Sequence, residues 1–141
     1  MSEIFQSSRR VEFRDTDMAG IVHFSNFFAY MEQVEHEFLR SLGLGVIMEM
    51  DGKKISFPRV HAECNYRKAI KFEQIIDVQL TVQKIGTKSL TYAVKFSLDG
   101  SPIADGSITA VCCEFDHGPR PVSMPIPSAF VDKVKPYLES N

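Results

Sequence analysis

The chain has 141 residues, a length that fits one domain and can bury a hydrophobic core. Its 44% hydrophobic and 24% charged residues are ordinary for a globular protein. The net charge of −2 argues against general electrostatic binding to nucleic acid, while a local basic patch could still hold an anionic ligand.

No segment predicts export, membrane insertion or a metal site. The first residues lack the basic and apolar stretches of a signal peptide, and no apolar run approaches the roughly 18 residues of a membrane span. Cys64, Cys112 and Cys113 form no C-x-x-C pair and have no histidine at ligand spacing, so we expect reduced packing residues. A cytoplasmic location is the default expectation.

The first predicted element is a half-buried strand over residues 8–15, where polar and apolar side chains alternate. The alternation places Asp15 on the same face as Val11 and Phe13, so we expect a partly buried carboxylate that is bonded to the next loop. That loop spans residues 16–24 and contains an Ala-Gly turn, which lets backbone approach a ligand closely.

A long helix follows this loop, and Ser25 or Asn26 can cap its start. Its apolar residues recur at helical spacing, at Phe27, Met31, Val34, Phe38 and Leu42. Gly43 supplies the stop signal. The helix should therefore have about 17 residues and a length of roughly 25 Å.

The rest of the chain predicts strands. Residues 44–53 indicate a short helical turn, with a bend at Asp51-Gly52. Four strands are expected over residues 54–66, 75–85, 89–98 and 102–115. Pro58 should place a bulge or an edge in the first of these. Residues 86–88 and 99–101 fit hairpin turns, and residues 128–138 fit a short terminal helix after a proline-rich link.

The order of these elements predicts an α+β fold. Four consecutive strands joined by short turns favour an antiparallel meander, and one helix with an apolar stripe must pack on one face of it. We therefore expect a curved five-stranded antiparallel sheet that holds a long central helix. Residues 1–141 are expected to form a single domain.

The loop and helix start carry a recognisable pattern. The stretch reads Asp15-Thr16-Asp17-x-x-Gly20-x-Val22-x-x-x-Asn26-x-x-x-Tyr30-Met31-Glu32. It resembles the signature of hot-dog-fold acyl-CoA thioesterases of the 4-hydroxybenzoyl-CoA thioesterase type. Residues 64–74 look like the family's segment ahead of its third strand, and the similar layout extends from about residue 5 to about residue 135.

The resemblance implies a hot-dog fold, a helix wrapped by the sheet. It also implies hydrolysis of an acyl-CoA substrate without metal or organic cofactor, since coenzyme A is itself part of the substrate. Two subunits should pair into a continuous sheet, with the site at their interface, and dimers commonly join into a homotetramer. Asp17 is the implied catalytic carboxylate, and the backbone amides around Phe24 and Ser25 are implied to polarise the thioester carbonyl.

The chemistry of these residues agrees with that implication. The carbonyl oxygen of a thioester gains negative charge in the transition state, and helix-terminal N–H groups can stabilise it. The Asp17 carboxylate could attack the carbonyl carbon directly or activate a water molecule, and the sequence leaves both routes open. The competing interpretation of Asp17 is a loop acid that caps a turn.

Further residues are candidates for contacts with the substrate, namely Gly20, Val22, His23, Asn26, Lys88 and Ser89. Lys88 and Ser89 fall where related enzymes often carry basic residues near the nucleotide. Other cations could also meet the phosphates of coenzyme A, although taken singly each is better explained as a solvated surface charge: Arg59, Arg67, Lys68, Lys71, Lys84 and Arg120. Phe24, Phe27 and Phe57 could line an acyl pocket or belong to the core. Asn26 could cap the helix or hold the loop.

Two other functions remain open. A hot-dog hydratase or dehydratase would need a paired histidine and acid, so His23 would have to meet Glu32 or Glu35, which are also reserve candidates for a catalytic acid. A non-catalytic acyl-CoA-binding protein would bind the same ligand without turnover. The acyl group, aromatic or short-chain, is not defined by the sequence.

Overall fold

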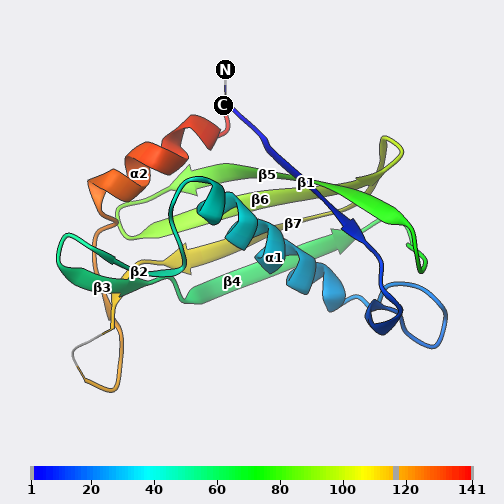
Figure 1. Cartoon of the computed structure of the whole chain (residues 1–141), viewed down its shortest axis with the longest axis horizontal. Helices are drawn as coiled ribbons and strands as arrows, with labels where there is room; N and C mark the ends of the chain where they lie inside the picture. Colours follow the sequence, from blue (N-terminus) through cyan, green and yellow to red (C-terminus); the bar gives the residue numbers. More distant parts are fainter. Residues whose placement is uncertain (1, 116–117, 141) are drawn as a thin grey trace.

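The computed structural model describes residues 2–115 and 118–140, and in them a long helix lies against one face of a five-stranded antiparallel sheet (Figure 1). In spatial order the strands are β1 (Phe5–Arg10), β5 (Ile75–Ile85), β6 (Ser89–Leu98), β7 (Ser101–Val111) and β4 (Arg59–Tyr66). The helix α1 is Asn26–Ser41. The predicted α+β architecture is confirmed, with β1 and β4 as the two edges of the sheet.

A second, smaller sheet continues beyond the end of α1. It contains β2 (Ile47–Met50), β3 (Lys53–Ser56), β8 (Cys113–Glu114) and β9 (Val122–Ser123). The helical turn predicted for residues 44–53 is therefore wrong. These residues form a hairpin, because Asp51 and Gly52 adopt positive φ angles of 54° and 74° that suit a tight turn.

The strand predicted over residues 54–66 is also wrong as one element. It breaks after Ser56, so that β3 and β4 belong to different sheets. Pro58 at the break has no backbone N–H to donate to a ladder, which explains why the chain changes sheets there. The strand predicted over residues 102–115 divides in the same way into β7 and β8.

The first strand lies earlier than predicted. β1 ends at Arg10, opposite Ile75, where its partner β5 begins. Only Val11 continues the pairing, through backbone hydrogen bonds with Gln74 and Glu73, and the positive φ of Glu73 (76°) ends the regular ladder there. The chain then forms a 3₁₀ turn over Phe13–Asp15 in place of the predicted strand end. Phe13 is 77% exposed as a result, so the alternation did not predict its burial correctly.

The terminal helix is shorter than predicted. α2 is Ser128–Val134 and is followed by a 3₁₀ turn over Lys135–Tyr137, which contains Pro136. None of the helices in residues 2–115 and 118–140 is long and apolar enough to cross a membrane.

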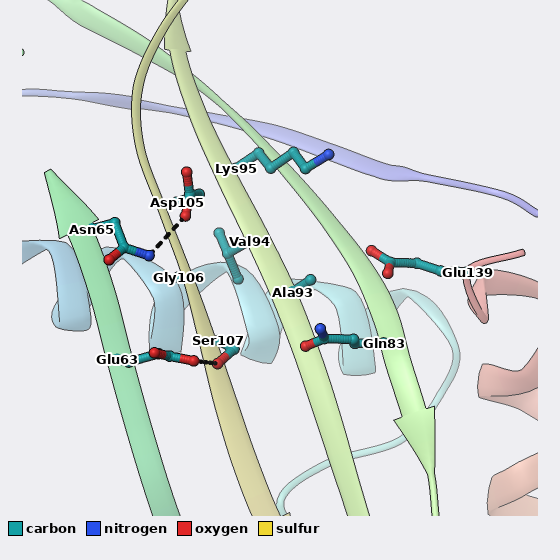
Figure 2. Close-up of a pocket in the computed structure, with 10 residues that line it drawn as sticks. All are labelled: Glu63, Asn65, Gln83, Ala93, Val94, Lys95, Asp105, Gly106, Ser107 and Glu139. Carbon is teal, nitrogen blue, oxygen red and sulfur yellow. Dashed lines mark hydrogen bonds between the residues drawn. The ribbon is translucent and has the colours of Figure 1, made fainter. Parts of the chain in front are cut away.

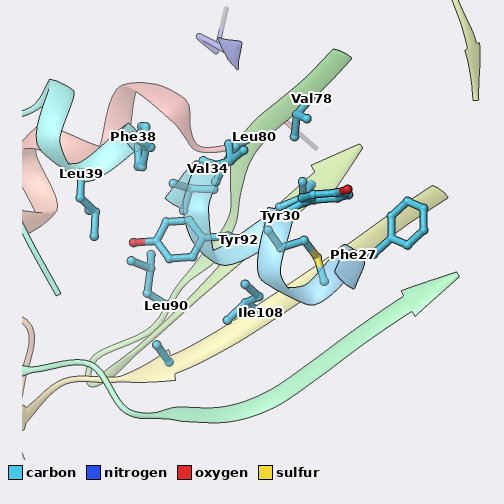
Figure 3. Packing of buried hydrophobic residues seen from close by; sticks show 14 of the residues in the cluster. Phe27, Tyr30, Val34, Phe38, Leu39, Val78, Leu80, Leu90, Tyr92 and Ile108 are labelled. Atoms are coloured by element: carbon cyan, nitrogen blue, oxygen red, sulfur yellow. The ribbon is translucent and has the colours of Figure 1, made fainter. Parts of the chain in front are cut away.

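The core lies between α1 and the sheet (Figure 3). The helix buries Phe27, Tyr30, Met31, Val34, Phe38 and Leu39 against sheet residues that include Val78, Leu80, Leu90, Tyr92 and Ile108. Each large apolar side chain buried in this way contributes about 1.5–3 kcal/mol. The helix sits close over β7, because a Cβ on Gly106 would lie only 2.8 Å from the Met31 sulfur.

One ion pair is buried beside this core. Glu35 of α1 is 1% exposed and accepts a hydrogen bond from Arg59, the first residue of β4. Arg59 also donates to the Phe57 carbonyl oxygen at 2.8 Å. Burial raises the pKa of the Glu35 carboxyl to about 7, and the Arg59 guanidinium opposes that shift. The pair joins the helix to the point where the chain enters the large sheet.

This environment predicts a pH-dependent stability. In the unfolded chain Glu35 ionises near its ordinary pKa of 4.5, whereas the folded chain keeps the proton up to about pH 7. The wild-type protein should therefore lose stability from this group as pH rises through that window. Glu35→Gln does not titrate, so its unfolding free energy relative to wild type should increase between pH 4.5 and 7.

Urea denaturation of both proteins at several pH values measures this difference. The exposed Glu49 of β2 offers a matched control, and Glu49→Gln should show no such trend. A constant difference between wild type and Glu35→Gln from pH 4.5 to 8 would contradict the prediction.

Candidate active site

Asp17 opens a small hairpin that links β1 to α1. Its backbone N–H donates to the Ile21 carbonyl oxygen at 2.9 Å, and Thr16 forms an antiparallel bridge with Val22. The Asp17 Oδ1 atom accepts the Ala19 N–H at 2.9 Å, which is the turn-capping role that the sequence left open. Its Oδ2 atom accepts no hydrogen bond from the described part of the chain and is therefore available for a ligand.

The Asp17 side chain lines a pocket of about 350 Å³. The other lining residues come from the hairpin, from the start of α1 and from the segment after β4: Ile21, Val22, Phe24, Phe27, Tyr66, Arg67, Lys68, Ala69 and Ile70. Val22, Phe27 and Ile70 are buried, so the floor of this pocket is apolar. The pocket thus places a carboxylate beside an apolar surface at one end of the sheet.

The start of α1 supplies backbone donors at the same place. The N–H groups of residues 26–28 donate to the carbonyl oxygens of His23, Phe24 and Ser25. Phe24 and Ser25 therefore carry the first amides without a carbonyl acceptor. Ser25 N–H has only a 3.3 Å contact with His23 Nδ1, and Phe24 N–H donates to no atom of the described residues. These two amides lie at the positive end of the helix dipole.

Side-chain capping of the helix, predicted from Ser25 or Asn26, is wrong because neither side chain makes a cap hydrogen bond. The Ser25 hydroxyl bonds to His23 Nδ1 at 2.8 Å. Asn26 Nδ2 donates to the Asp15 carbonyl oxygen at 2.7 Å, so this side chain holds the loop, the second of the two predicted roles.

Asp15 anchors the whole segment. Its Oδ2 atom accepts the Tyr30 hydroxyl at 2.8 Å and the Glu12 N–H at 2.9 Å, while its carbonyl oxygen accepts the His23 N–H at 2.9 Å. Burial and then the Asp15 hydrogen bond raise the pKa of Tyr30 well above its usual value, so the hydroxyl remains a neutral donor. The prediction of a partly buried, hydrogen-bonded Asp15 is confirmed, although a 3₁₀ turn replaces the predicted strand.

The remaining predicted residues are divided between the pocket and other parts of the fold. Gly20 sits in the hairpin with a φ of +79°, outside the pocket lining. Ser89 is the first residue of β6 and Lys88 directly precedes it. Phe96, which packs against Phe27 at 5.3 Å between ring centroids, lies near the end of that strand. At about 3.3 Å per residue this separation is roughly 20–25 Å, so one chain alone does not bring Lys88 to the pocket.

Two further sets of predicted residues are separated from Asp17. His23 stacks beside Phe24 at 4.6 Å. Of the two acids that a dehydratase would have to bring to it, Glu35 is paired with Arg59 in the core and Glu32 lines a different hollow, beside His36. Phe57 stacks on Phe130 of α2 at 4.7 Å, so the core interpretation is correct for this ring. Phe24 and Phe27 do line the pocket.

Tyr66 is the residue that sequence reasoning missed. Its hydroxyl donates to the Phe24 carbonyl oxygen at 3.0 Å, and its ring packs against Phe27 at 5.4 Å. The side chain at the end of β4 therefore holds the first turn of α1 from outside. Strand alternation could not have found this contact, because it does not tell which strand end meets the helix.

Comparison with known proteins shows the family of this chain. Residues 11–134 match the model of the thioesterase-like superfamily. A 1,4-dihydroxy-2-naphthoyl-CoA hydrolase of Prochlorococcus marinus is 30% identical over 110 residues, which cover 73% of this chain and 71% of that protein. A putative esterase of Aquifex aeolicus is 34% identical over 85 residues, 60% of this chain and 66% of that protein.

Solved structures show the same fold. A gentisyl-coenzyme A thioesterase superposes with a TM-score of 0.78 at 30% identity, covering 94% of this chain and 99% of that one. A 1,4-dihydroxy-2-naphthoyl-CoA thioesterase from Synechocystis gives 0.81 at 21% identity, covering 94% and 96%, which shows a shared fold. The architecture is therefore the hot-dog fold. The chain belongs to the thioesterase-like superfamily, and the protein is a thioester hydrolase.

The anchoring role of Asp15 can be tested by its effect on stability. Asp15→Ala leaves the Tyr30 hydroxyl and the Glu12 amide without their acceptor, which should lower the unfolding free energy by about 2–3 kcal/mol. Tyr30→Phe removes only one of these bonds and should cost about 1 kcal/mol. Because the two residues share a hydrogen bond, the double variant should cost less than the sum when measured by urea denaturation. Full additivity, or an Asp15→Ala variant as stable as wild type, would show that this anchor is absent.

Proposed function

We propose that this thioester hydrolase acts on acyl-CoA, producing a carboxylic acid and coenzyme A, with Asp17 as the catalytic carboxylate. The observation that carries the proposal is one of geometry. An Asp17 carboxylate oxygen without a hydrogen-bond partner and the backbone N–H of Phe24, which donates to no atom of the described residues, belong to two residues that line the same pocket. A carboxylate and a helix-terminal donor are the two groups that thioester hydrolysis requires.

The reaction would follow from these two groups. The thioester carbonyl oxygen would accept hydrogen bonds from the Phe24 and Ser25 amides, which strengthen as negative charge develops there. Asp17 would either attack the carbonyl carbon, forming an anhydride that water then cleaves, or remove a proton from an attacking water molecule. In both routes the C–S bond breaks, and the sulfur leaves as the thiolate of coenzyme A, which takes up a proton.

The acyl group is proposed to be aromatic. The rings of Phe24, Phe27 and Tyr66 line the pocket together with apolar Val22 and Ile70, and aromatic groups favour edge contacts with such rings. The relatives point the same way, since their names specify gentisyl and dihydroxynaphthoyl thioesters. A short aliphatic acyl group would leave part of this surface uncovered.

The role of Asp17 predicts a specific kinetic defect. Asp17→Asn should lower kcat by about 10²–10⁴-fold, because the amide can neither attack carbon nor accept a proton. The melting temperature should stay near that of wild type, since Asn Oδ1 can still accept the Ala19 N–H. Release of free thiol from acyl-CoA measures the first effect, and calorimetry the second.

The same assay ranks substrates and provides the control. Aromatic acyl-CoAs should be hydrolysed with higher kcat/KM than short-chain aliphatic ones. Asp132→Asn, a matched change on the exposed side of α2, should leave the rate unchanged. Near-native activity of Asp17→Asn would reject this catalyst, and tight binding of coenzyme A without turnover across the panel would favour a non-catalytic binding protein.

We also propose that two subunits pair through β4. This strand is an edge of the large sheet, and Val60 and Tyr66 on it are 62% and 45% exposed. An uncovered edge is a template for pairing with a second copy. Around a two-fold axis the strands run antiparallel, so the Arg59 end of one β4 lies beside the Tyr66 end of the other.

This pairing would complete the site. Arg59 of β4 pairs with Ala110 of β7, and Ala110 pairs in turn with Leu90 of β6. Lys88, two residues before Leu90, therefore lies at the Arg59 end of the sheet. The dimer would bring Lys88 and Ser89 of the partner subunit toward the Asp17 pocket, which a single chain does not. The proposed state is a dimer, which can assemble further into a dimer of dimers.

A charge on the edge should prevent this pairing. Val60→Lys is expected to shift the protein toward the monomer in sedimentation equilibrium and to lower kcat/KM with it. Val122 on β9 is similarly exposed, at 58%, so Val122→Lys is the matched control and should leave the oligomer intact. An unchanged oligomer in Val60→Lys would place the interface elsewhere.

A further inference from the structure

We infer that Arg67, Lys68 and Lys95 form a binding site for the phosphate groups of the thioester's carrier, at the same end of the sheet as Asp17. The inference rests on the proposed function and deepens it. It assigns the phosphates to cations of the same chain as the catalytic carboxylate, at the opposite end of the sheet from Lys88.

The first observation is the position of Arg67 and Lys68. Both residues line the Asp17 pocket, directly after β4 ends at Tyr66. Their backbone N–H groups donate to the same Ile103 carbonyl oxygen, at 2.7 and 3.2 Å. The turn that carries the two cations is therefore fixed on β7, and their side chains start from a rigid base beside the pocket.

The second observation is that Arg67 connects the two faces of the sheet. It also lines a hollow of about 600 Å³, whose walls include Lys95, Phe96 and Gly100. Lys95 and Asp105 are cross-strand partners on the face turned away from α1, where Asn65 bonds to Asp105 at 3.1 Å (Figure 2). A ligand that leaves the Asp17 pocket past Arg67 would therefore meet a second cavity.

Positively charged side chains outnumber carboxylates around the two adjoining cavities. Arg67 pairs with Asp105, whose pKa is held below its usual value by the Asn65 hydrogen bond and the Arg67 guanidinium. Lys68 donates to the Ser101 hydroxyl at 2.5 Å and forms no ion pair within the described residues. Arg67, Lys68 and Lys95 thus face two carboxylates, Asp105 and the Asp17 of the adjoining pocket, which leaves one positive charge in excess on a chain whose net charge is −2.

The chemistry of thioester carriers explains this arrangement. A pocket of about 350 Å³ lies at the lower end of the range for small-molecule sites, so it is too small to hold an acyl group, a pantetheine arm and a nucleotide together. The phosphorylated end must leave through the mouth. Lys and Arg are the usual partners of phosphate oxygens, and Arg67 and Lys68 are the cations at that mouth.

Kinetics with and without phosphate test the inference. Lys68→Glu and the double variant Arg67→Gln/Lys68→Gln should raise KM about tenfold or more for the best acyl-CoA, because charge-assisted hydrogen bonds are lost, with kcat nearly unchanged. The corresponding S-acyl-pantetheine has no phosphate, so its KM should not change. Lys135→Glu, on the exposed turn after α2, is the control for net charge and should behave as wild type.

The phosphate could belong to free coenzyme A or to the phosphopantetheine of a carrier protein. Loss with acyl-CoA alone would assign the site to the nucleotide phosphates, and equal loss with acyl-carrier protein would assign it to the phosphate next to pantetheine. An unchanged KM for acyl-CoA in both variants would overturn the inference, as would equal losses with acyl-CoA and S-acyl-pantetheine. A defect in Lys88→Ala instead of Lys68→Glu would move the phosphate site to Lys88, which reaches the Asp17 pocket only across the proposed dimer.

Binding of coenzyme A itself separates this inference from the proposed function. In isothermal titration calorimetry, Lys68→Glu should raise the Kd of coenzyme A about tenfold, whether or not the protein turns over any thioester. If Asp17→Asn loses hydrolysis while Lys68→Glu binds coenzyme A as wild type does, the phosphate site is wrong and the proposed function stands.

Discussion

The arrangement of the pocket depends on the hydrogen bonds of Asp15. Donors reach this residue from the turn before it, through Glu12, and from the start of α1, through His23, Asn26 and Tyr30. The bonds from Glu12 and Tyr30 reach the carboxylate and are worth about 1.5–3 kcal/mol each, while those from His23 and Asn26 reach the backbone carbonyl oxygen and are worth about 0.5–1.5 kcal/mol each. Together these contacts fix both ends of the hairpin that carries Asp17. The position of the catalytic candidate relative to the helix amides is thus set by a neighbouring acid that does no chemistry itself.

The start of α1 can hold its amides in place because the rest of the helix is packed against the sheet. The apolar face of α1 packs on the sheet, and Gly106 lets Met31 approach β7 closely. The Glu35–Arg59 pair adds a directional contact to this packing. A buried ion pair is weak evidence for stability, since apolar residues often serve as well. Its effect here is to fix the entry of the edge strand β4 relative to the helix, and β4 also carries Tyr66 to the pocket.

Regular patterns in the sequence predicted the regular parts of the fold. β5 and β6 lie where alternation placed them, and the apolar spacing located α1 to within a residue or two. The predictions that proved wrong concern segments whose structure is determined by contacts with distant parts of the chain or by a turn. Alternation continued to Asp15, but β1 ends at Arg10, because beyond Val11 the positive φ of Glu73 ends the ladder with the segment before β5. Residues 44–53 have no strong period, and the turn at Asp51 and Gly52 made them a hairpin.

The candidate site shows the same division. Asp17, Phe24 and Phe27 could be selected from residue type and from their place at a helix start, and the structure brings them to one pocket. The contribution of Tyr66 could not be selected, because its contact with Phe24 joins residues 42 positions apart. Lys88 illustrates the converse case. The register of β6 determines where Lys88 lies within its own chain. Its distance from the Asp17 pocket of a second subunit depends on how two copies of the chain pair.

The two kinds of positive group near Asp17 would act at different stages of the reaction. Amides at a helix terminus gain most when charge develops on the carbonyl oxygen, so they favour the transition state over the bound substrate. Cations at Arg67 and Lys68 would hold phosphates whose charge does not change during hydrolysis, so they would lower KM without raising kcat. The fold keeps these effects apart, because the amides belong to α1 and the cations to the turn held on Ile103. Affinity for the carrier and rate of cleavage can therefore vary independently in this pocket.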